Sequence, residues 1–261
     1  MFKVVVFDAY GTLFDVYSVS KMAETLFPGQ GQALSVMWRD KQIEYSRLIS
    51  MSDPHNPNGS RHYQSFWDIT RLALNYSCQR LKLELTSHAQ KELLDQYAEL
   101  KAFPENLGVL HDLQKRGYKT AILSNGSPEM LATAVRSAGM TTLIDKVISV
   151  DSVRQFKTSP ESYALVLQNY AVDKREVLFV SSNSWDALGA TWFGFRSFWV
   201  NRQDLPYETL GPKELDPSSL EFAIKQARQV AQVLGVAPET LVKKATERWQ
   251  RKSRSPSTAR T

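Results

Sequence analysis

The stretch KVVVFDAYGT at residues 3–12 decides the fold. Its apolar run, Val4-Val5-Val6-Phe7, has the composition of a strand that is buried on both faces of a parallel sheet. Asp8 ends the run, and the following Ala9-Tyr10-Gly11-Thr12 predicts a tight turn that surrounds the carboxylate with backbone N–H groups. A carboxylate at the end of a buried strand is therefore the first candidate functional group of the chain.

Further apolar, β-branched segments continue this pattern along the chain: YKTAILS (118–124), KVISV (146–150), EVLFVS (176–181) and RSFWV (196–200). Amphipathic helical patterns separate them, at 105–116, 128–138, 160–170 and 185–193. Alternation of buried strands with helices is typical of the α/β class. The sequence thus predicts a doubly wound, Rossmann-like parallel sheet.

Residues 15–100 interrupt the alternation, because they hold amphipathic helical patterns and almost no strand signal. We interpret them as a helical cap domain inserted after the first strand, so that residues 1–14 and 101–235 form the core domain. Within the cap, SDPHNPNGS (52–60) is rich in turn formers and predicts a loop between helices. Helices are also predicted at 217–234 and 238–250, and residues 236–261 are assigned to a C-terminal helix and a basic tail.

The composition favours a cytoplasmic protein. With 261 residues, of which 43% are hydrophobic, the chain is long enough to bury a sizeable core. Its single cysteine, Cys78, cannot form an internal disulfide, and its four histidines are scattered without metal-ligand spacing. The run Val4–Phe7 is too short for a signal peptide or a membrane span. We expect no membrane partner.

The net charge of +5 is concentrated at the C-terminus. Residues 243–261 contain seven Lys or Arg and one acid, so the rest of the chain is nearly neutral. This distribution argues against nucleic acid as a partner of the folded body. The last residues, RKSRSPSTART (251–261), predict a solvated, disordered tail, and the alternative is a segment that binds an anionic surface.

Polar residues follow each of the first four predicted strands. Asp8 follows the first, Ser124-Asn125-Gly126 the second, Lys157 the third after a loop, and the run from Ser181 to Asp186 the fourth. Any one of these has a structural alternative, since Asp and Ser after strands often cap the next helix. Ligands of open α/β sheets bind at the carboxyl ends of the strands, so four polar groups on one edge predict a functional site.

In these motifs the chain resembles the haloacid dehalogenase superfamily, which has an Asp after strand one, a Ser or Thr after strand two, a Lys, and a polar or acidic group after strand four. It is more narrowly similar to the L-2-haloacid dehalogenases, over about residues 1–200. The segments that carry this similarity are FDAYGTLFDV (7–16), WRDKQIEYSRL (38–48), FWDITRLAL (66–74), ILSNGSPEML (122–131), FKTSPESYAL (156–165) and VLFVSSNSWDALGA (177–190).

The residues at the metal-binding positions of the superfamily distinguish two functions. Most members are magnesium-dependent phosphatases that need a second acid two residues after the nucleophile and further carboxylates after strand four. Here Tyr10 occupies the first of these positions, and Ser181 and Asn183 leave Asp186 alone at the others. We therefore expect neither metal nor organic cofactor. Two alternatives stay open: a magnesium-dependent small-metabolite phosphatase on the same fold, and a non-catalytic binding protein that uses the basic tail.

The resemblance implies that Asp8 displaces halide from a small L-2-haloacid, with inversion to a D-2-hydroxyacid, through an ester that water hydrolyses. Lys157 would keep Asp8 ionised, because a nearby positive charge favours a carboxylate, and Tyr163 would position the ammonium. Asp186, together with Asn183, would orient or deprotonate the water. The alternative for Lys157 is an ordinary surface lysine.

Arg39 is assigned by the resemblance to the departing halide, although it could instead pair with Asp40 or Glu44 on a helix surface. Hydrogen bonds from Thr12 and Ser181 would hold the two carboxylates. The expected substrate-binding residues are Ser124 and Asn125 for the substrate carboxylate, Arg39 and Asn183 as polar contacts, and an apolar pocket of Tyr10, Ile43, Phe66 and Trp185. The implied partners are the haloacid, water, halide and a second copy of the chain, because the family usually forms homodimers.

Overall fold

The computed structural model describes residues 2–203 and 237–254, together with positions 205, 210, 224, 227, 228 and 231. Most of the helix predicted at 217–234 lies outside the described residues. In the described part of the chain, no helix is both long enough and apolar enough to cross a membrane.

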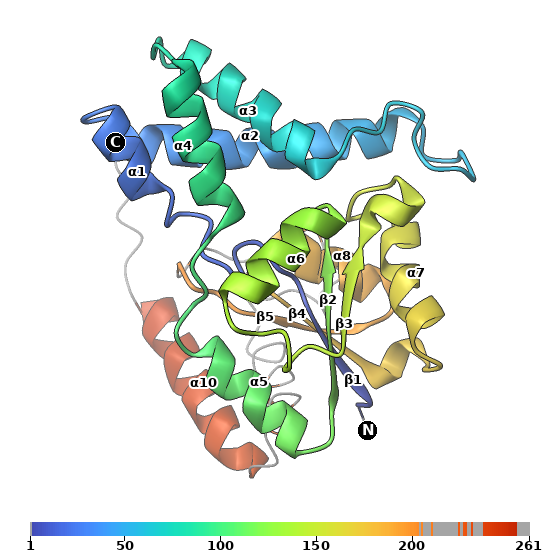
Figure 1. Cartoon of the computed structure of the whole chain (residues 1–261). Helices are drawn as coiled ribbons and strands as arrows, with labels where there is room; N and C mark the ends of the chain where they lie inside the picture. The colour runs from blue at the N-terminus through green and yellow to red at the C-terminus, as the bar shows by residue number, and fades with distance from the viewer. Residues whose placement is uncertain are drawn as a thin grey trace.

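Five parallel strands form the sheet in the order β3-β2-β1-β4-β5, shown in Figure 1. They are β1 (Val4–Phe7), β2 (Lys119–Ser124), β3 (Lys146–Ser149), β4 (Val177–Ser181) and β5 (Arg196–Trp199). All residues of β1 are buried, because neighbours β2 and β4 flank this central strand. The chain builds outward from β1 to β3 and then returns to β4 on the other side. This reversal confirms the doubly wound α/β class and places the switch point at the end of β1.

The helices predicted around the sheet are confirmed as α5 (Asn106–Lys115), α6 (Pro128–Ser137), α7 (Pro160–Asn169) and α8 (Ser184–Phe193). Local signals explain their ends. Ser127 caps α6 by accepting a hydrogen bond from the backbone N–H of Met130, and Pro128 occupies the first turn. Gly194 ends α8 with φ of 109°, a left-handed conformation that favours glycine.

Four helices lie together beyond the carboxyl ends of the strands (Figure 1). They are α1 (Ser20–Leu26), α2 (Gly31–Ser52), α3 (Phe66–Arg80) and α4 (Ser87–Ala98). We call them the helical layer. The two chain segments that join it to the sheet are paired: Asp15 N donates to Lys101 O at 2.8 Å, and Phe103 N donates to Leu13 O at 3.1 Å. The helical layer is therefore placed directly over the edge of the sheet where polar residues were predicted.

The loop predicted at 52–60 is confirmed as the connection between α2 and α3, and it continues as far as Ser65. The last helix of the described residues is α10 (Pro238–Arg254). The prediction of a disordered tail from residue 251 is wrong for residues 251–254, which continue the helix because none of them is Pro or Gly. Residues 255–261 lie outside the described residues.

Candidate active site

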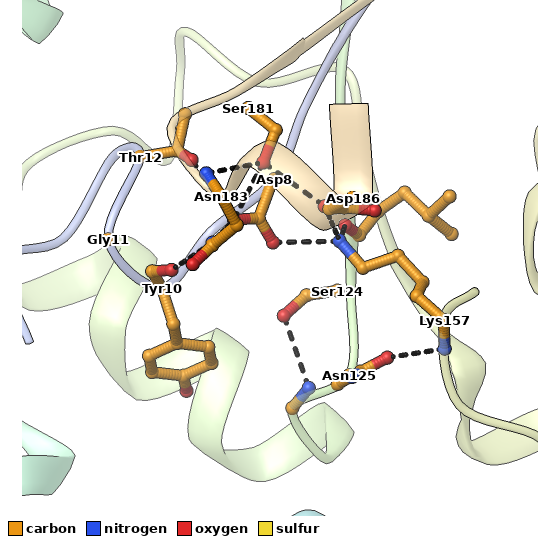
Figure 2. A network of polar contacts seen from close by, with 12 residues as sticks. Asp8, Tyr10, Gly11, Thr12, Ser124, Asn125, Lys157, Ser181, Asn183 and Asp186 are labelled. Atoms are coloured by element: carbon orange, nitrogen blue, oxygen red, sulfur yellow. Dashed lines mark hydrogen bonds and ion pairs between the residues drawn. The ribbon is translucent and has the colours of Figure 1, made fainter. Parts of the chain in front are cut away.

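The predicted polar residues of the sheet edge converge at the switch point, as Figure 2 shows. Asp8 follows β1, Ser124 ends β2 and Ser181 ends β4, so the three reach the same region from adjacent strands. Asp186 lies in the first turn of α8, and Lys157 precedes α7. Parallel pairing thus brings together residues that are far apart in sequence.

Lys157 is the centre of a buried ion network. Its Nζ lies 2.7 Å from Asp8 Oδ1 and 2.6 Å from Asp186 Oδ2, and it donates a further hydrogen bond to Leu123 O at 3.1 Å. The exposed fraction of Lys157 is 1%, which excludes the surface-lysine alternative. Each of the three hydrogens of an ammonium can meet one of these acceptors, so the network satisfies the buried positive charge.

Burial and charge act in opposite directions on the pKa values of this network. Burial raises the pKa of Asp186 to about 6, although the Lys157 ammonium opposes the shift, and the nearby Asp8 carboxylate adds to it. Burial would lower the pKa of Lys157, but the two carboxylates outweigh it and raise that pKa above its ordinary value. At neutral pH the ammonium is therefore charged, while Asp186 titrates close enough to neutrality to exchange a proton.

Neutral donors hold the second oxygen of Asp8. Asn183 Nδ2 donates to Asp8 Oδ2 at 2.7 Å, Thr12 Oγ1 at 3.0 Å and Ser181 Oγ at 3.4 Å. Thr12 is itself fixed by the backbone N–H of Ser182, which donates to Thr12 Oγ1 at 2.8 Å. These contacts stabilise the ionised carboxylate and restrict its rotation, as a nucleophile requires.

Asp186 is held from two further sides. Tyr163 donates its hydroxyl hydrogen to Asp186 Oδ1 at 2.8 Å, and Ser181 Oγ donates to Asp186 Oδ2 at 3.2 Å. Burial, followed by the Asp186 charge, raises the pKa of Tyr163 well above its ordinary value, so the phenol stays a donor. The hydroxyl of Tyr163 thus contacts Asp186, which in turn contacts the Lys157 ammonium, so the expected positioning of Lys157 by Tyr163 would act through Asp186.

Arg39 reaches the site from α2 in the helical layer. It is 8% exposed, and its Nη2 donates to Tyr10 O at 3.3 Å and to Asn183 Oδ1 at 3.4 Å. Glu44, one of the acids that could have paired with it on the surface, instead forms an ion pair with Lys41 at 2.8 Å. Because both acceptors of Arg39 are uncharged, its positive charge is available to a bound anion.

A small cavity lies between the helical layer and the sheet edge, with a volume of about 10 Å³, which is room for about one water molecule. Ten of the residues predicted for the site line it: Asp8, Tyr10, Arg39, Ile43, Phe66, Ser124, Asn125, Lys157, Asn183 and Trp185. Thr12, Tyr163, Ser181 and Asp186 are not among its lining residues, and they contact the ion network directly. All fourteen candidates are therefore gathered in one region.

The loop after β2 forms one wall of the cavity. Ser124 Oγ accepts a hydrogen bond from Gly126 N at 3.1 Å, which leaves its hydroxyl hydrogen for another acceptor. Asn125 Oδ1 accepts from the backbone N–H of Lys157 at 2.9 Å, so this side chain also fixes the lysine backbone. A Cβ at Gly126 would lie 2.7 Å from the Tyr10 ring, and glycine is required by this close approach.

Sequence reasoning missed two residues of the site. Ser46 lines the cavity; it lies one and two turns after Ile43 and Arg39 on α2, so helical spacing could have found it. Ser182 donates its hydroxyl hydrogen to Gly11 O and its backbone N–H to Thr12, which fixes the turn after Asp8. Its position within the run from Ser181 to Asp186 was the only available signal.

Comparisons with known proteins agree with this geometry. A family model described as haloacid dehalogenase-like hydrolase matches residues 2–194. An (S)-2-haloacid dehalogenase of Pseudomonas sp. strain YL is 41% identical over 209 residues, which cover 80% of this chain and 87% of that protein. A crystal structure of an L-2-haloacid dehalogenase is similar with a TM-score of 0.77 and 56% identity, over 80% of this chain and 90% of that one. The structure of L-2-haloacid dehalogenase from Xanthobacter autotrophicus with chloropropionic acid covalently bound is similar with a TM-score of 0.71 and 38% identity, over 94% and 88% of the two chains.

Proposed function

The chain belongs to the haloacid dehalogenase-like hydrolases, close to their (S)-2-haloacid dehalogenases, and we propose that it hydrolyses small L-2-haloacids to D-2-hydroxyacids. The observation that carries the proposal is the Asp8–Lys157 ion pair of 2.7 Å at a cavity that Arg39 also lines. An ionised, oriented carboxylate is a nucleophile, and a guanidinium beside it is a site for the anion that leaves.

In the first step an oxygen of Asp8 attacks C2 of the haloacid from the side opposite the halogen. The C–O bond of an ester forms, and the electrons of the carbon–halogen bond leave with the halide. The negative charge thereby moves from Asp8 to the halide, which Arg39 stabilises. Because attack comes from the back, the configuration at C2 inverts.

In the second step water attacks the carboxyl carbon of Asp8 rather than C2 of the substrate. Asp186 accepts a proton from that water, for which a pKa of about 6 suits a base near neutral pH. The Lys157 ammonium stabilises the negative charge that develops on the ester oxygen. Collapse releases the hydroxyacid, whose new hydroxyl oxygen comes from Asp8, restores the carboxylate and delivers one proton to solvent.

The residues that line the cavity favour a small, partly apolar substrate, although they must move apart to admit it because the cavity has room for about one water molecule. Tyr10, Ile43, Phe66 and Trp185 provide apolar surface for the halogen and a short alkyl group. Ser124 supplies an uncharged donor for the substrate carboxylate. An uncharged donor suits this role because the Asp8, Lys157, Asp186 and Arg39 charges already balance each other.

The residues around Asp8 do not fit a magnesium-dependent phosphatase. Tyr10 replaces the second acid, and Asn183 contacts Asp8 Oδ2 where a metal-binding carboxylate would be needed. Within the described residues, no cluster of three or more His, Cys, Asp or Glu side chains could hold a metal ion. The side chains around Asp8 therefore favour attack of its carboxylate on carbon without a metal ion.

The assignment of residues 15–100 to a cap domain is part of the proposal, supported by the position of the helical layer over the site. Residues 1–14 and 101–235 would then form the core, and 236–261 a C-terminal extension. Homodimer formation and a cytoplasmic location belong to the proposal as well; the family resemblance and the single, buried Cys78 support them. Sedimentation velocity would test the dimer.

The proposed function is tested by incubating the protein separately with L- and D-2-chloropropionate. Chloride release and the configuration of the lactate are followed together. The expected result is chloride and D-lactate from the L enantiomer alone. Release from D-2-chloropropionate at an equal rate, or L-lactate as the product, would contradict the assignment.

A further inference from the structure

The long loop between α2 and α3 contacts the core close to Lys157. The backbone N–H of Ser60 donates to Arg154 O at 3.0 Å, and Gln155 Nε2 donates to Asp53 O at 3.1 Å. A Cβ at Gly59 would lie 2.3 Å from Val153 O, so the two backbones approach as closely as glycine permits. The loop therefore forms a second contact between the helical layer and the core. This contact is distant in sequence from the paired segments around Asp15 and Lys101 that connect the two.

Its partner in the core is the segment of residues 150–157, which we call the lysine segment. It begins with the short 3-10 helix η1 (Val150–Val153) after β3 and ends at Lys157, so its backbone sets where the lysine side chain starts. On its core side, Asn125 Oδ1 accepts from Lys157 N. On its other side, Ser50 of α2 accepts a hydrogen bond from Phe156 N at 2.7 Å. The residue before Lys157 is thus held by the helical layer.

Tyr63 makes two contacts with the lysine segment at once. Its hydroxyl donates to Asp151 Oδ1 at 2.5 Å, and its ring stacks on Phe156 with centroids 5.0 Å apart. Burial and the Asp151 carboxylate raise the pKa of Tyr63, so the phenol remains a donor. Phe156 is fully buried and also packs edge-on against Phe66, which lines the cavity. The tyrosine therefore fixes both ends of the segment that delivers the lysine.

We propose that Tyr63 is a positioning residue for Lys157, acting through Asp151 and Phe156, so that the α2–α3 loop holds the ammonium between the two carboxylates of the site. This inference rests on the proposed function, because it concerns a step of the same reaction. Loss of Tyr63 lets the lysine segment shift, and displacement of a catalytic group by about 1 Å costs up to about a hundredfold in rate. Apart from Lys157, the residues that line the cavity lie outside the lysine segment, so KM should change less than kcat.

A displaced ammonium has a second, diagnostic effect. Three groups face Asp186: Lys157 of the lysine segment, Asp8, which follows β1, and Tyr163 of α7. Of these, Lys157 is the charge that lowers its pKa, against burial and the Asp8 charge that raise it. When the ammonium moves away, the pKa of Asp186 rises further, and the acid limb of the kcat profile moves to higher pH. A purely structural role of Tyr63 would lower thermal stability without moving that limb.

The test compares Tyr63→Ala, Tyr63→Phe and Asp151→Asn with the wild-type full chain, using L-2-chloropropionate as substrate and chloride release as the readout. The phenylalanine keeps the ring on Phe156 and removes the hydroxyl, and Asp151→Asn keeps the shape of the acceptor. Tyr45→Ala is the matched control, because Tyr45, like Tyr63, is a partly buried tyrosine, but it lies in α2 and packs on Tyr76. For each variant, kcat, KM and the midpoint of the acid limb are measured.

The expected result is a decrease in kcat of about tenfold or more for Tyr63→Ala, with KM within about threefold and an acid limb at higher pH. Tyr63→Phe and Asp151→Asn, which change only the hydrogen bond between the two residues, should have kcat values between those of Tyr63→Ala and the wild type. If Tyr63→Ala does not fold, Tyr63→Phe takes its place in the comparison. The inference, but not the proposed function, would be overturned if both Tyr63 variants kept the wild-type kcat and acid limb. An equal loss of kcat in Tyr45→Ala would overturn it as well. A wild-type protein that releases no chloride would overturn the proposed function and the inference with it.

Discussion

Asn183 donates its side-chain N–H to Asp8 Oδ2, across the carboxylate from the oxygen that Lys157 contacts. Its amide oxygen accepts from Arg39 at 3.4 Å, so one side chain links the nucleophile to the guanidinium. The amide is uncharged, and it can therefore contact Asp8 without repelling it. The site differs in this respect from a magnesium site, in which further carboxylates would surround the metal ion.

Replacement of this amide by a carboxylate of the same shape should inactivate the enzyme. In Asn183→Asp two carboxylates face each other, one of them takes up a proton, and kcat for L-2-chloropropionate should fall by about a hundredfold or more. Asn183→Ala, which removes the donor without adding charge, should lose less. Chloride release at pH 7 measures both variants, and an Asn183→Asp enzyme as active as the alanine variant would argue against a charge effect.

Removal of the base should stop the reaction at the ester. In Asp186→Asn, Asp8 keeps its contact with Lys157 and can still attack, but no carboxylate is left to accept the proton of water. We expect a burst of chloride close to one equivalent per enzyme and a protein mass increased by one 1-carboxyethyl group, the ester that Asp8 forms with C2 of the substrate. Intact mass spectrometry detects it, with Asp8→Asn as the control that cannot form the ester. Continued turnover without an adduct would exclude Asp186 as the base.

The pH profile should carry the signature of the buried Asp186. Its pKa is raised to about 6, and a base acts only when ionised, so kcat should fall as the pH drops through about 6 and level off above it. A steady-state profile of kcat between pH 4 and pH 9 would show this limb. If activity instead persisted until the pH approached 3.8, the ordinary value for an aspartate, burial would not control the base.

Chelation of metals should leave the activity unchanged. The carboxylate oxygens of Asp8 and Asp186 already accept hydrogen bonds from Lys157 and from neutral donors. A divalent ion would therefore find neither carboxylate of the site free of a partner. Dialysis against EDTA followed by assays with and without magnesium measures the dependence directly. Restoration of a lost activity by magnesium would contradict the proposed mechanism, and phosphate release from small phosphate esters would favour the phosphatase.

Local sequence patterns were sufficient for most of the core. The run Val4–Phe7 is apolar because both faces of β1 are covered, and Ser127-Pro128 and Gly194 mark helix ends through backbone geometry. Such signals depend on near neighbours, which is why the strands and the helices beside them could be predicted. The helical conformation of residues 251–254 could not, because a basic, polar composition is compatible with a helix and with a disordered tail.

Contacts between distant segments were harder to predict. The Tyr63–Asp151 hydrogen bond joins residues 88 positions apart, and no local pattern pairs them. Tyr163 was expected to position the ammonium, but no sequence pattern indicated that its hydroxyl would contact Asp186, which lies between the two. The site itself was predictable because parallel strands place their carboxyl ends together, so polar residues after β1, β2 and β4 had to meet.

In the proposed mechanism Asp8 becomes bonded to carbon, and water then attacks Asp8. A single turnover of L-2-chloropropionate with excess enzyme in oxygen-18 water tests it most directly, with mass analysis of both the lactate and the peptide that contains Asp8. We expect unlabelled lactate and one oxygen-18 atom in Asp8. Labelled lactate from the first turnover, with an unlabelled Asp8 peptide, would show that water attacks the substrate itself and would contradict it.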